Sequence, residues 1–139
     1  MREEISCGAV LYTRVEGEIK YLIIKQRGGH YGFPKGHMEG NETEYETARR
    51  EVKEEVGITV TDFVESFRTS DEYILPHKRG TKKRVILFLA EYTDQRIVIQ
   101  KKELFGASLY SYDEAMKLLS FDGSRRMLSE AHEFLNKRG

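Results

Sequence analysis

The sequence predicts an α/β fold in which helices cover a mixed β-sheet. Two early runs, "ISCGAVLYTRV" (5–15) and "KYLIIKQR" (20–27), are rich in β-branched and aromatic residues, as strands are. Segments with helical spacing follow in the middle and at the end of the chain. Strands interleaved with a few helices favour a sheet between helical layers, and the order of the strands is left open.

The first two strands are expected to form a hairpin, because "EGEI" (16–19) between them contains Gly17. The next stretch, "GGHYGFPKGHMEGNE" (28–42), carries five glycines and Pro34, which argues against regular structure. Long structured loops in compact domains are usually functional. We therefore expect a functional loop over 28–42.

A helix is expected between Thr43 and Gly57. Thr43 is a credible N-cap, Glu46 completes a capping box three residues later, and Gly57 is a typical stop. The apolar stripe of this helix consists of Tyr45, Ala48, Val52 and Val56.

The remaining elements follow from the same patterns. Runs typical of strands occupy 58–69, 84–92, about 96–100 and 104–111, and two further helices are expected at 112–119 and 123–137. No internal repeat, low-complexity segment or Pro/Gly-rich linker divides the chain, so we expect one domain over 1–139.

The charge balance excludes some partners. The 23 basic and 23 acidic residues cancel, so no global field attracts DNA or an anionic membrane. No run approaches the roughly 20 apolar residues of a membrane helix, and the N-terminus has no apolar signal core. The single cysteine, Cys7, lies in an apolar run and is expected to be a buried thiol. A reducing cytoplasm is the expected compartment, and the oligomeric state is left open.

An acidic face distinguishes the helix at 43–57. At about 100° per residue, Glu51, Glu54 and Glu55 fall on one side, where like charges cost roughly 0.2–0.5 kcal/mol per pair. Only Glu54 has a basic residue at helical contact distance, namely Arg50. This face is either a solvated charged surface or a site for a divalent cation, and hard carboxylate oxygens select Mg²⁺ or Mn²⁺.

The stretch "GHMEGNETEYETARREVKEEVGI" (36–58) matches the pattern G-x5-E-x7-R-E-U-x-E-E-x-G-U, where U is aliphatic. The fixed positions are filled by Gly36, Glu42, Arg50, Glu51, Val52, Glu54, Glu55, Gly57 and Ile58. This pattern resembles the Nudix box, the signature of hydrolases that act on a nucleoside diphosphate linked to another moiety. The resemblance implies a Nudix-like α/β/α sandwich with a mixed β-sheet between helices.

The resemblance also implies roles for individual residues. Glu51, Glu54 and Glu55 would be metal-binding carboxylates, helped by a backbone carbonyl at Lys35 or Gly36. Arg50 would pair with Glu42 and orient the cluster, so that water attacks a phosphorus of a polyphosphate held by the metal.

The general base is left open. Members of the family use either a glutamate of the box or one on a later loop, and here the two candidates are Glu51 and Glu103. Glu103 would serve as base or as a further metal ligand, although an ordinary turn glutamate explains it as well.

The segments that flank the box resemble those of asymmetric diadenosine tetraphosphate hydrolases, a Nudix subgroup; they include "GHYGFPKGH" and "GTKKRVILFLAEY". The resemblance implies that phosphates are contacted by His30, Lys35 and either Lys82 or Lys83, and that Tyr73 and Phe121 sandwich an adenine. Lysines are natural partners of phosphate, and base–aromatic stacking is worth about 1–3 kcal/mol per base. Each assignment has a plainer alternative: the basic segment could be a solvated loop, and the aromatic residues could be part of the core.

The leading hypothesis is a metal-dependent hydrolase of dinucleoside polyphosphates that splits diadenosine tetraphosphate into ATP and AMP, with Mg²⁺ or Mn²⁺ as cofactor and a small nucleotide as partner. The alternative is a Nudix hydrolase acting on RNA 5′-triphosphate ends or on oxidised nucleoside triphosphates. An RNA end is a partner only under that alternative. A non-catalytic module that senses a nucleotide is the third hypothesis.

Overall fold

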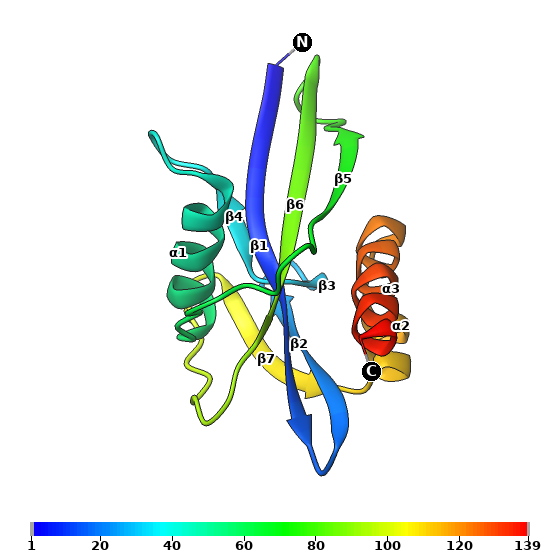
Figure 1. Ribbon diagram of the computed structural model, residues 1–139. Coiled ribbons are helices and arrows are strands. Elements are labelled where there is room, and N and C mark those ends of the chain that lie inside the picture. The colour runs from blue at the N-terminus through cyan, green and yellow to red at the C-terminus, as the bar shows by residue number, and fades with distance from the viewer. Residues whose placement is uncertain (1, 139) are drawn as a thin grey trace.

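The computed structural model describes residues 2–138, and their strands form one mixed sheet (Figure 1). The strands are β1 (Arg2–Val15), β2 (Glu18–Gln26), β3 (Tyr31–Gly32), β4 (Lys35–His37), β5 (Thr69–Ile74), β6 (Thr81–Glu91) and β7 (Leu104–Tyr110). The main path is β3-β2-β1-β6-β5, with β4 paired to β1 and β7 paired to β2. β1 and β6 are parallel neighbours, whereas the other pairs are antiparallel, so the sheet is mixed as predicted.

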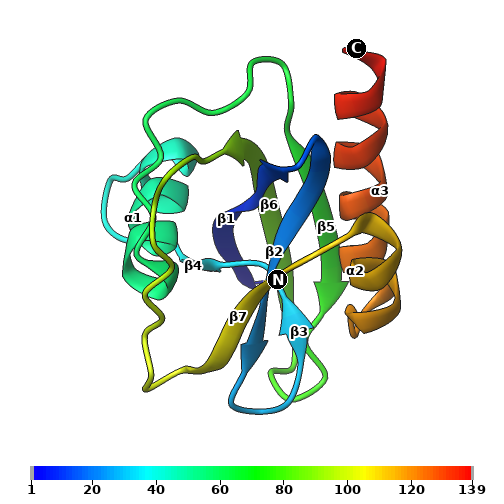
Figure 2. The same cartoon turned by 90° about the horizontal axis from the view of Figure 1, so that it is seen from below.

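Helices cover both faces of this sheet. Helix α1 (Glu44–Val56) lies on one side, and α2 (Tyr112–Leu118) and α3 (Asp122–Lys137) lie on the other (Figures 1 and 2). Alternate residues of β1 serve the two layers, because side chains of a strand point alternately to opposite faces. Val10 and Tyr12 pack in the core beneath α2 and α3, whereas Ala9 and Leu11 pack in the core beneath α1. The predicted sandwich of helices around a mixed sheet is therefore confirmed.

Helix α1 begins and ends where its sequence signals lie. Thr43 accepts a hydrogen bond from the Glu46 N–H at 3.1 Å, and the Glu46 carboxylate accepts one from the Thr43 N–H at 2.8 Å. Gly57 has a φ of 75°, a left-handed conformation in which glycine is unstrained, and its N–H bonds to the Lys53 carbonyl.

The apolar stripe of α1 is buried except at its first turn. Ala48, Val52 and Val56 are fully buried. Tyr45 is 48% exposed, and its ring stacks on Phe88 with a centroid distance of 4.2 Å. The same ring also lies 5.5 Å from that of Phe63, so its exposed side chain still packs on two aromatic residues.

The C-terminal helices agree with the sequence to within a few residues. Ser111 and Glu114 form a capping box at the start of α2. α3 buries Met127, Leu128, Ala131 and Leu135. Among residues 2–138, no helix combines the length and apolar character needed to cross a membrane.

The segment 58–69 is not the strand that its alternating apolar residues predict. Ile58 and Val60 are buried, yet most of this segment is irregular, and β5 begins only at Thr69. Side chains bind its backbone in place of a strand ladder: Thr59 exchanges two hydrogen bonds with the amide of Gln95, and Arg49 donates to the Val60 carbonyl. The prediction was wrong because periodic burial also suits an irregular segment whose polar groups are otherwise satisfied.

Two further segments differ from the sequence prediction. Residues 96–100 form no strand; the Val98 N–H bonds to the Val56 carbonyl and the Gln100 N–H to the Glu55 carbonyl, each at 2.9 Å. These bonds satisfy carbonyls at the end of α1, which a helix itself leaves unpaired. The glycine-rich loop over 28–42 contains the short strands β3 and β4, because its backbone joins the sheet at β2 and β1.

Candidate active site

Arg50 ties the glycine-rich loop to helix α1. Its Nε lies 2.7 Å from Glu42 Oε2 and its Nη2 lies 3.0 Å from Glu42 Oε1, and Nη2 also donates to the His37 carbonyl at 3.0 Å. These hydrogen bonds from Arg50, helped by the Glu39 N–H, lower the pKa of Glu42 to about 2. The predicted pair of Glu42 and Arg50 is therefore present as a bidentate contact, the geometry that an arginine favours with a carboxylate.

Arg50 also reaches the acidic face of the helix. Its Nη1 lies 3.1 Å from Glu51 Oε1 and 3.2 Å from Glu54 Oε2. The expectation that Glu51 has no basic partner was wrong, because the long arginine side chain bends back to its sequence neighbour. One oxygen of each carboxylate is engaged in this way, which leaves Glu51 Oε2 and Glu54 Oε1 outside the Arg50 contacts.

Glu55 is a buried carboxylate behind this face. It is 5% exposed, and its Oε2 accepts a hydrogen bond from the Lys35 N–H at 3.2 Å. Burial, followed by the negative charge of Glu51, raises the pKa of Glu55 to about 8, and Glu103 adds to the rise. A cation placed here would offset both effects.

Gly36 lies against Glu51, another carboxylate of the cluster. A Cβ at Gly36 would overlap the Glu51 carboxylate, so only glycine permits this approach. The Glu51 side chain is 14% exposed, and burial raises its pKa. Gly36 thus shapes the cradle in which Glu51 lies.

The donor set suits a hard divalent cation, since carboxylate oxygens are the preferred ligands of Mg²⁺ and Mn²⁺. Within residues 2–138, however, no three or more His, Cys, Asp or Glu side chains are arranged so that they could hold one ion together. In this arrangement Arg50 contacts one oxygen each of Glu51 and Glu54. A shared ion therefore requires these side chains to turn.

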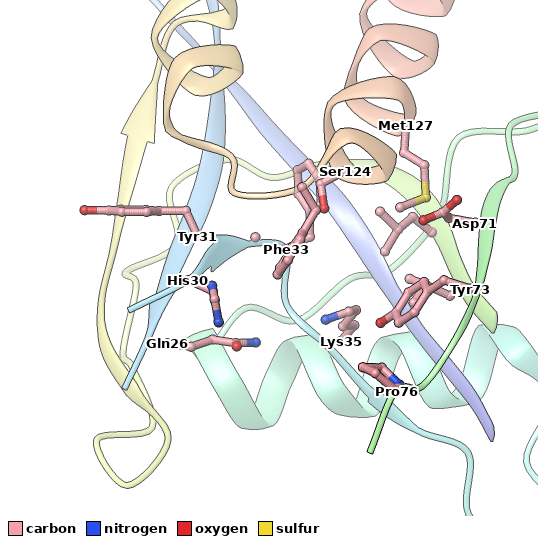
Figure 3. Close-up of a pocket in the computed structure, with 14 residues that line it drawn as sticks. Gln26, His30, Tyr31, Phe33, Lys35, Asp71, Tyr73, Pro76, Ser124 and Met127 are labelled. Carbon is pink, nitrogen blue, oxygen red and sulfur yellow. The ribbon is translucent and has the colours of Figure 1, made fainter. Parts of the chain in front are cut away.

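A cleft of about 420 Å³ opens beside Lys35, on the face of the sheet that α3 covers. It brings together four of the predicted substrate-binding residues: His30, Lys35, Tyr73 and Phe121. Figure 3 shows His30, Lys35 and Tyr73 around this space, although they come from separate segments. The ring of His30 lies 5.1 Å from that of Phe121, and Tyr73 and Phe121 are about half exposed, at 45% and 55%.

The two lysines predicted from the basic segment do not line this cleft. Lys82 Nζ lies 3.8 Å from Glu3 Oε2 and 3.6 Å from Glu72 Oε2. Lys83 is buried, donates to Ser6 Oγ at 2.6 Å, and has its pKa lowered chiefly by burial. As neighbours on β6 the two side chains point to opposite faces. Their assignment to phosphate stays a prediction.

Glu103 lies in the turn before β7, close enough to Glu55 that its negative charge helps to raise the pKa of Glu55. The Gln100 N–H bonds to the Glu55 carbonyl at 2.9 Å, which attaches this turn to the end of α1. The Arg27 N–H donates to the Glu103 carbonyl at 3.0 Å. The second candidate base is thus brought near the acidic cluster, whereas its role stays a prediction.

Several cleft residues had no signal in the sequence. Gln26, Asp71, Ser124 and Met127 line the cleft from β2, β5 and α3. Arg126 lies 3.3 Å from Asp71 Oδ1, which helps to hold that carboxylate in the wall. No motif or spacing connects these residues along the chain; only the pairing of β5 with β6 and the packing of α3 bring them together.

The comparisons with known proteins agree with this geometry. The NUDIX domain matches residues 4–131. The bis(5′-nucleosyl)-tetraphosphatase [asymmetrical] of Rattus norvegicus is 33% identical over 141 residues, which cover 94% of each chain, and that of Mus musculus is 31% identical with the same coverage. The chain therefore belongs to the NUDIX family and is a Nudix hydrolase. Hydrolases of this family generally need a divalent metal.

Two further proteins extend the comparison. The NAD-capped RNA hydrolase NudC of Klebsiella pneumoniae is 34% identical over 126 residues, covering 89% of this chain and 46% of that protein. The crystal structure of a C. elegans Ap4A hydrolase binary complex has a TM-score of 0.88 and 24% identity, covering 96% of this chain and 98% of that one. The structural likeness shows the shared Nudix fold.

Proposed function

We propose that the protein hydrolyses dinucleoside polyphosphates, splitting diadenosine tetraphosphate into ATP and AMP. One observation carries the proposal: the cleft and the acidic cluster meet at two consecutive residues of β4. Lys35 lines the cleft, while its N–H binds Glu55 and the next residue, Gly36, lies against Glu51. A nucleotide with its base in the cleft would extend its phosphates to the carboxylates. The names of the rat and mouse relatives support this substrate class.

The cleft residues bind and orient the substrate in this proposal. Tyr73 and Phe121 stack on an adenine, an interaction worth about 1–3 kcal/mol per base. His30 and Lys35 contact the phosphates that leave the cleft. Burial lowers the pKa of Lys35 while the charge of Glu55 opposes that shift, so a phosphate chain would add to the stabilisation of its ammonium.

Hydrolysis requires a water oxygen to form a bond to phosphorus while a bridging P–O bond breaks. The leaving phosphate keeps the electron pair of that bond, and a carboxylate takes the proton of the water. Glu51 and Glu103 are the two candidates for this base, and Arg50 contacts Glu51 at 3.1 Å. Glu54 completes the candidate catalytic group on the same helix face.

Glu51, Glu54 and Glu55 would hold the divalent metal, with the Gly36 carbonyl and Glu103 as further ligands. When bound, Mg²⁺ or Mn²⁺ compensates phosphate charge and makes the attacking water more acidic. The burial of Glu55 supports this assignment, because a buried carboxylate is stabilised by a paired cation or a bound metal.

A product assay tests the proposal. Diadenosine tetraphosphate is incubated with the protein and Mg²⁺, and the products are separated by anion-exchange chromatography. We expect ATP and AMP in equal amounts from the first time point. Two molecules of ADP, or no turnover with either Mg²⁺ or Mn²⁺, would refute the assignment.

Hydrolysis of RNA 5′ ends is the second candidate, favoured by the 34% identity to a NAD-capped RNA hydrolase. The two functions are separated by specificity constants measured side by side on diadenosine tetraphosphate, NAD-capped RNA, 5′-triphosphorylated RNA and an oxidised nucleoside triphosphate. A higher constant on an RNA end would replace the first proposal with the second.

A further inference from the structure

A second aromatic surface lies outside the cleft, where β2, β3 and β7 adjoin. Phe105, near the start of β7, is 57% exposed. It lines a depression of about 170 Å³ together with Lys25 and Tyr31. We call Lys25, Arg27, Tyr31 and Phe105 the distal patch. Nothing in the proposed chemistry of the cleft uses it.

Two cations flank the exposed ring of the distal patch. Arg27 Cζ lies 4.9 Å from the centroid of Phe105, and Lys25 Nζ lies 5.8 Å from it and 5.5 Å from the Tyr31 centroid. Across residues 2–138, neither cation takes part in an ion pair with a carboxylate. A single exposed aromatic is ordinary, whereas an exposed ring close to two cations that lack carboxylate partners matches a base joined to a phosphate.

The distal patch adjoins the cleft. Tyr31 lines both hollows, and its ring points away from the cleft toward β7, whereas His30 and Lys35 lie within the cleft (Figure 3). Arg27 links the patch to the turn that carries Glu103, because its backbone N–H binds the Glu103 carbonyl and its Nε donates to the Lys101 carbonyl at 2.8 Å.

Backbone hydrogen bonds therefore connect both aromatic sites to the neighbourhood of the acidic cluster. Lys35 connects it to the cleft through the hydrogen bond to Glu55. Arg27 connects Glu103 to the distal patch. A ligand with two bases joined by phosphates would match two adjoining aromatic sites near one acidic cluster.

We propose that the distal patch binds the second nucleoside of a dinucleoside polyphosphate, with its base on Phe105 and the adjoining phosphate beside Lys25 and Arg27. This inference rests on the proposed function, since only a substrate with two bases needs a second aromatic site. Adenosine 5′-tetraphosphate, which carries the same number of phosphates and one adenosine, would leave the patch empty.

The test compares two substrates in one set of variants. The readout is the ratio of kcat/KM on diadenosine tetraphosphate to kcat/KM on adenosine 5′-tetraphosphate. Phe105→Ala should lower this ratio about tenfold, the size expected for loss of one stacked base. Phe105→Trp should restore the ratio, because it keeps a ring. Val15→Ala serves as the matched control, since it trims another exposed hydrophobic strand residue, 43% exposed, and should leave the ratio unchanged.

An unchanged ratio in Phe105→Ala, or an equal loss on both substrates, would overturn the inference. A loss confined to a 5′-triphosphorylated RNA oligonucleotide would also overturn it, by assigning the patch to an RNA chain. Failure of the proposed function has a different appearance: the wild-type protein would form two ADP from diadenosine tetraphosphate, or would cleave neither nucleotide. In that case, calorimetric titration with both nucleotides in Ca²⁺ tests the inference separately. Phe105→Ala should weaken binding of diadenosine tetraphosphate and leave binding of adenosine 5′-tetraphosphate unchanged. Equal affinities of the wild type and the variant for diadenosine tetraphosphate would exclude the site.

Discussion

Gly36 and Glu51 lie against each other so closely that a side chain at position 36 would occupy the space of the Glu51 carboxylate. The two residues come from different elements, β4 and α1, and Arg50 holds Glu51 from the other direction at 3.1 Å. The position of this carboxylate is therefore determined by a strand on one side and by an arginine on the other. Binding of a shared ion would require Glu51 to leave the Arg50 contact, whereas the space that Gly36 leaves for the carboxylate would remain.

Gly36→Ala should displace Glu51 and lower kcat/KM on diadenosine tetraphosphate by about a hundredfold, the cost of moving a catalytic group by about 1 Å. Gly28→Ala is the matched control, because a Cβ there meets only the His30 ring at 3.9 Å. Steady-state kinetics and circular dichroism are measured on both variants. A folded Gly36→Ala variant with wild-type kinetics would show that the position of Glu51 is unimportant.

Glu54→Gln should lower kcat at least about 100-fold in Mg²⁺, because a direct metal ligand matters more than the second-layer groups whose loss costs about 10–100-fold. The Glu54 side chain is 50% exposed, so the free energy of unfolding should change by less than about 0.5 kcal/mol. Glu133→Gln, another exposed helical glutamate, is the control. Full activity of Glu54→Gln would remove Glu54 from the site.

The pattern of α1 was predictable because its signals are local. The capping box of Thr43 and Glu46, the stop at Gly57 and the spacing of buried residues all operate within a few residues of each other. The fixed positions of the box likewise fall on this one loop and helix. The pair of Glu42 and Arg50 was predicted correctly, whereas the contact of Arg50 with Glu51 was not.

Features that depend on distant chain segments were not predictable in the same way. β5 is a largely polar edge strand that forms only by pairing with β6, and it supplies Asp71 and Tyr73 to the cleft. The alternation in 58–69 resembled a strand because irregular backbone can also bury alternate residues. Lys82 belongs to a network with Glu3 and Glu72, and no local pattern reports which of its neighbours in space are acidic.

Glu55 should make the metal-free protein less stable as the pH rises. Its pKa is raised from an ordinary value of 4.5 to about 8 in the folded state. The folded protein then binds this proton more tightly than the unfolded chain does. Stability from Glu55 is therefore complete below about pH 4.5 and is lost as the pH rises to about 8.

Glu55→Gln has no such proton and should lack that loss of stability. Urea unfolding of both proteins in EDTA, from pH 5 to pH 8.5, measures the difference, and addition of Mg²⁺ should restore stability to the wild type at the upper end. Parallel pH profiles for the two proteins would mean that Glu55 titrates as an ordinary carboxylate.

Cys7 should resist alkylation in the folded protein. The residue is fully buried in β1, and burial raises the pKa of its thiol from 9.0 to about 11. Because the thiolate is the reactive form, the rate with iodoacetamide should keep rising through pH 8–10 instead of reaching a plateau near the ordinary pKa. Mass spectrometry follows the labelling, with the urea-unfolded protein as the reference. Equal rates in the folded and unfolded states would indicate an accessible thiol.

The most direct measurement is a crystal structure with Mg²⁺ and a non-hydrolysable analogue of diadenosine tetraphosphate. We expect Glu51 and Glu54 turned from Arg50 toward at least one ion shared with Glu55, phosphates leading from that ion past Lys35, and a base between Tyr73 and Phe121. An ordered analogue bound elsewhere, with these carboxylates still on Arg50 and free of metal, would refute the account.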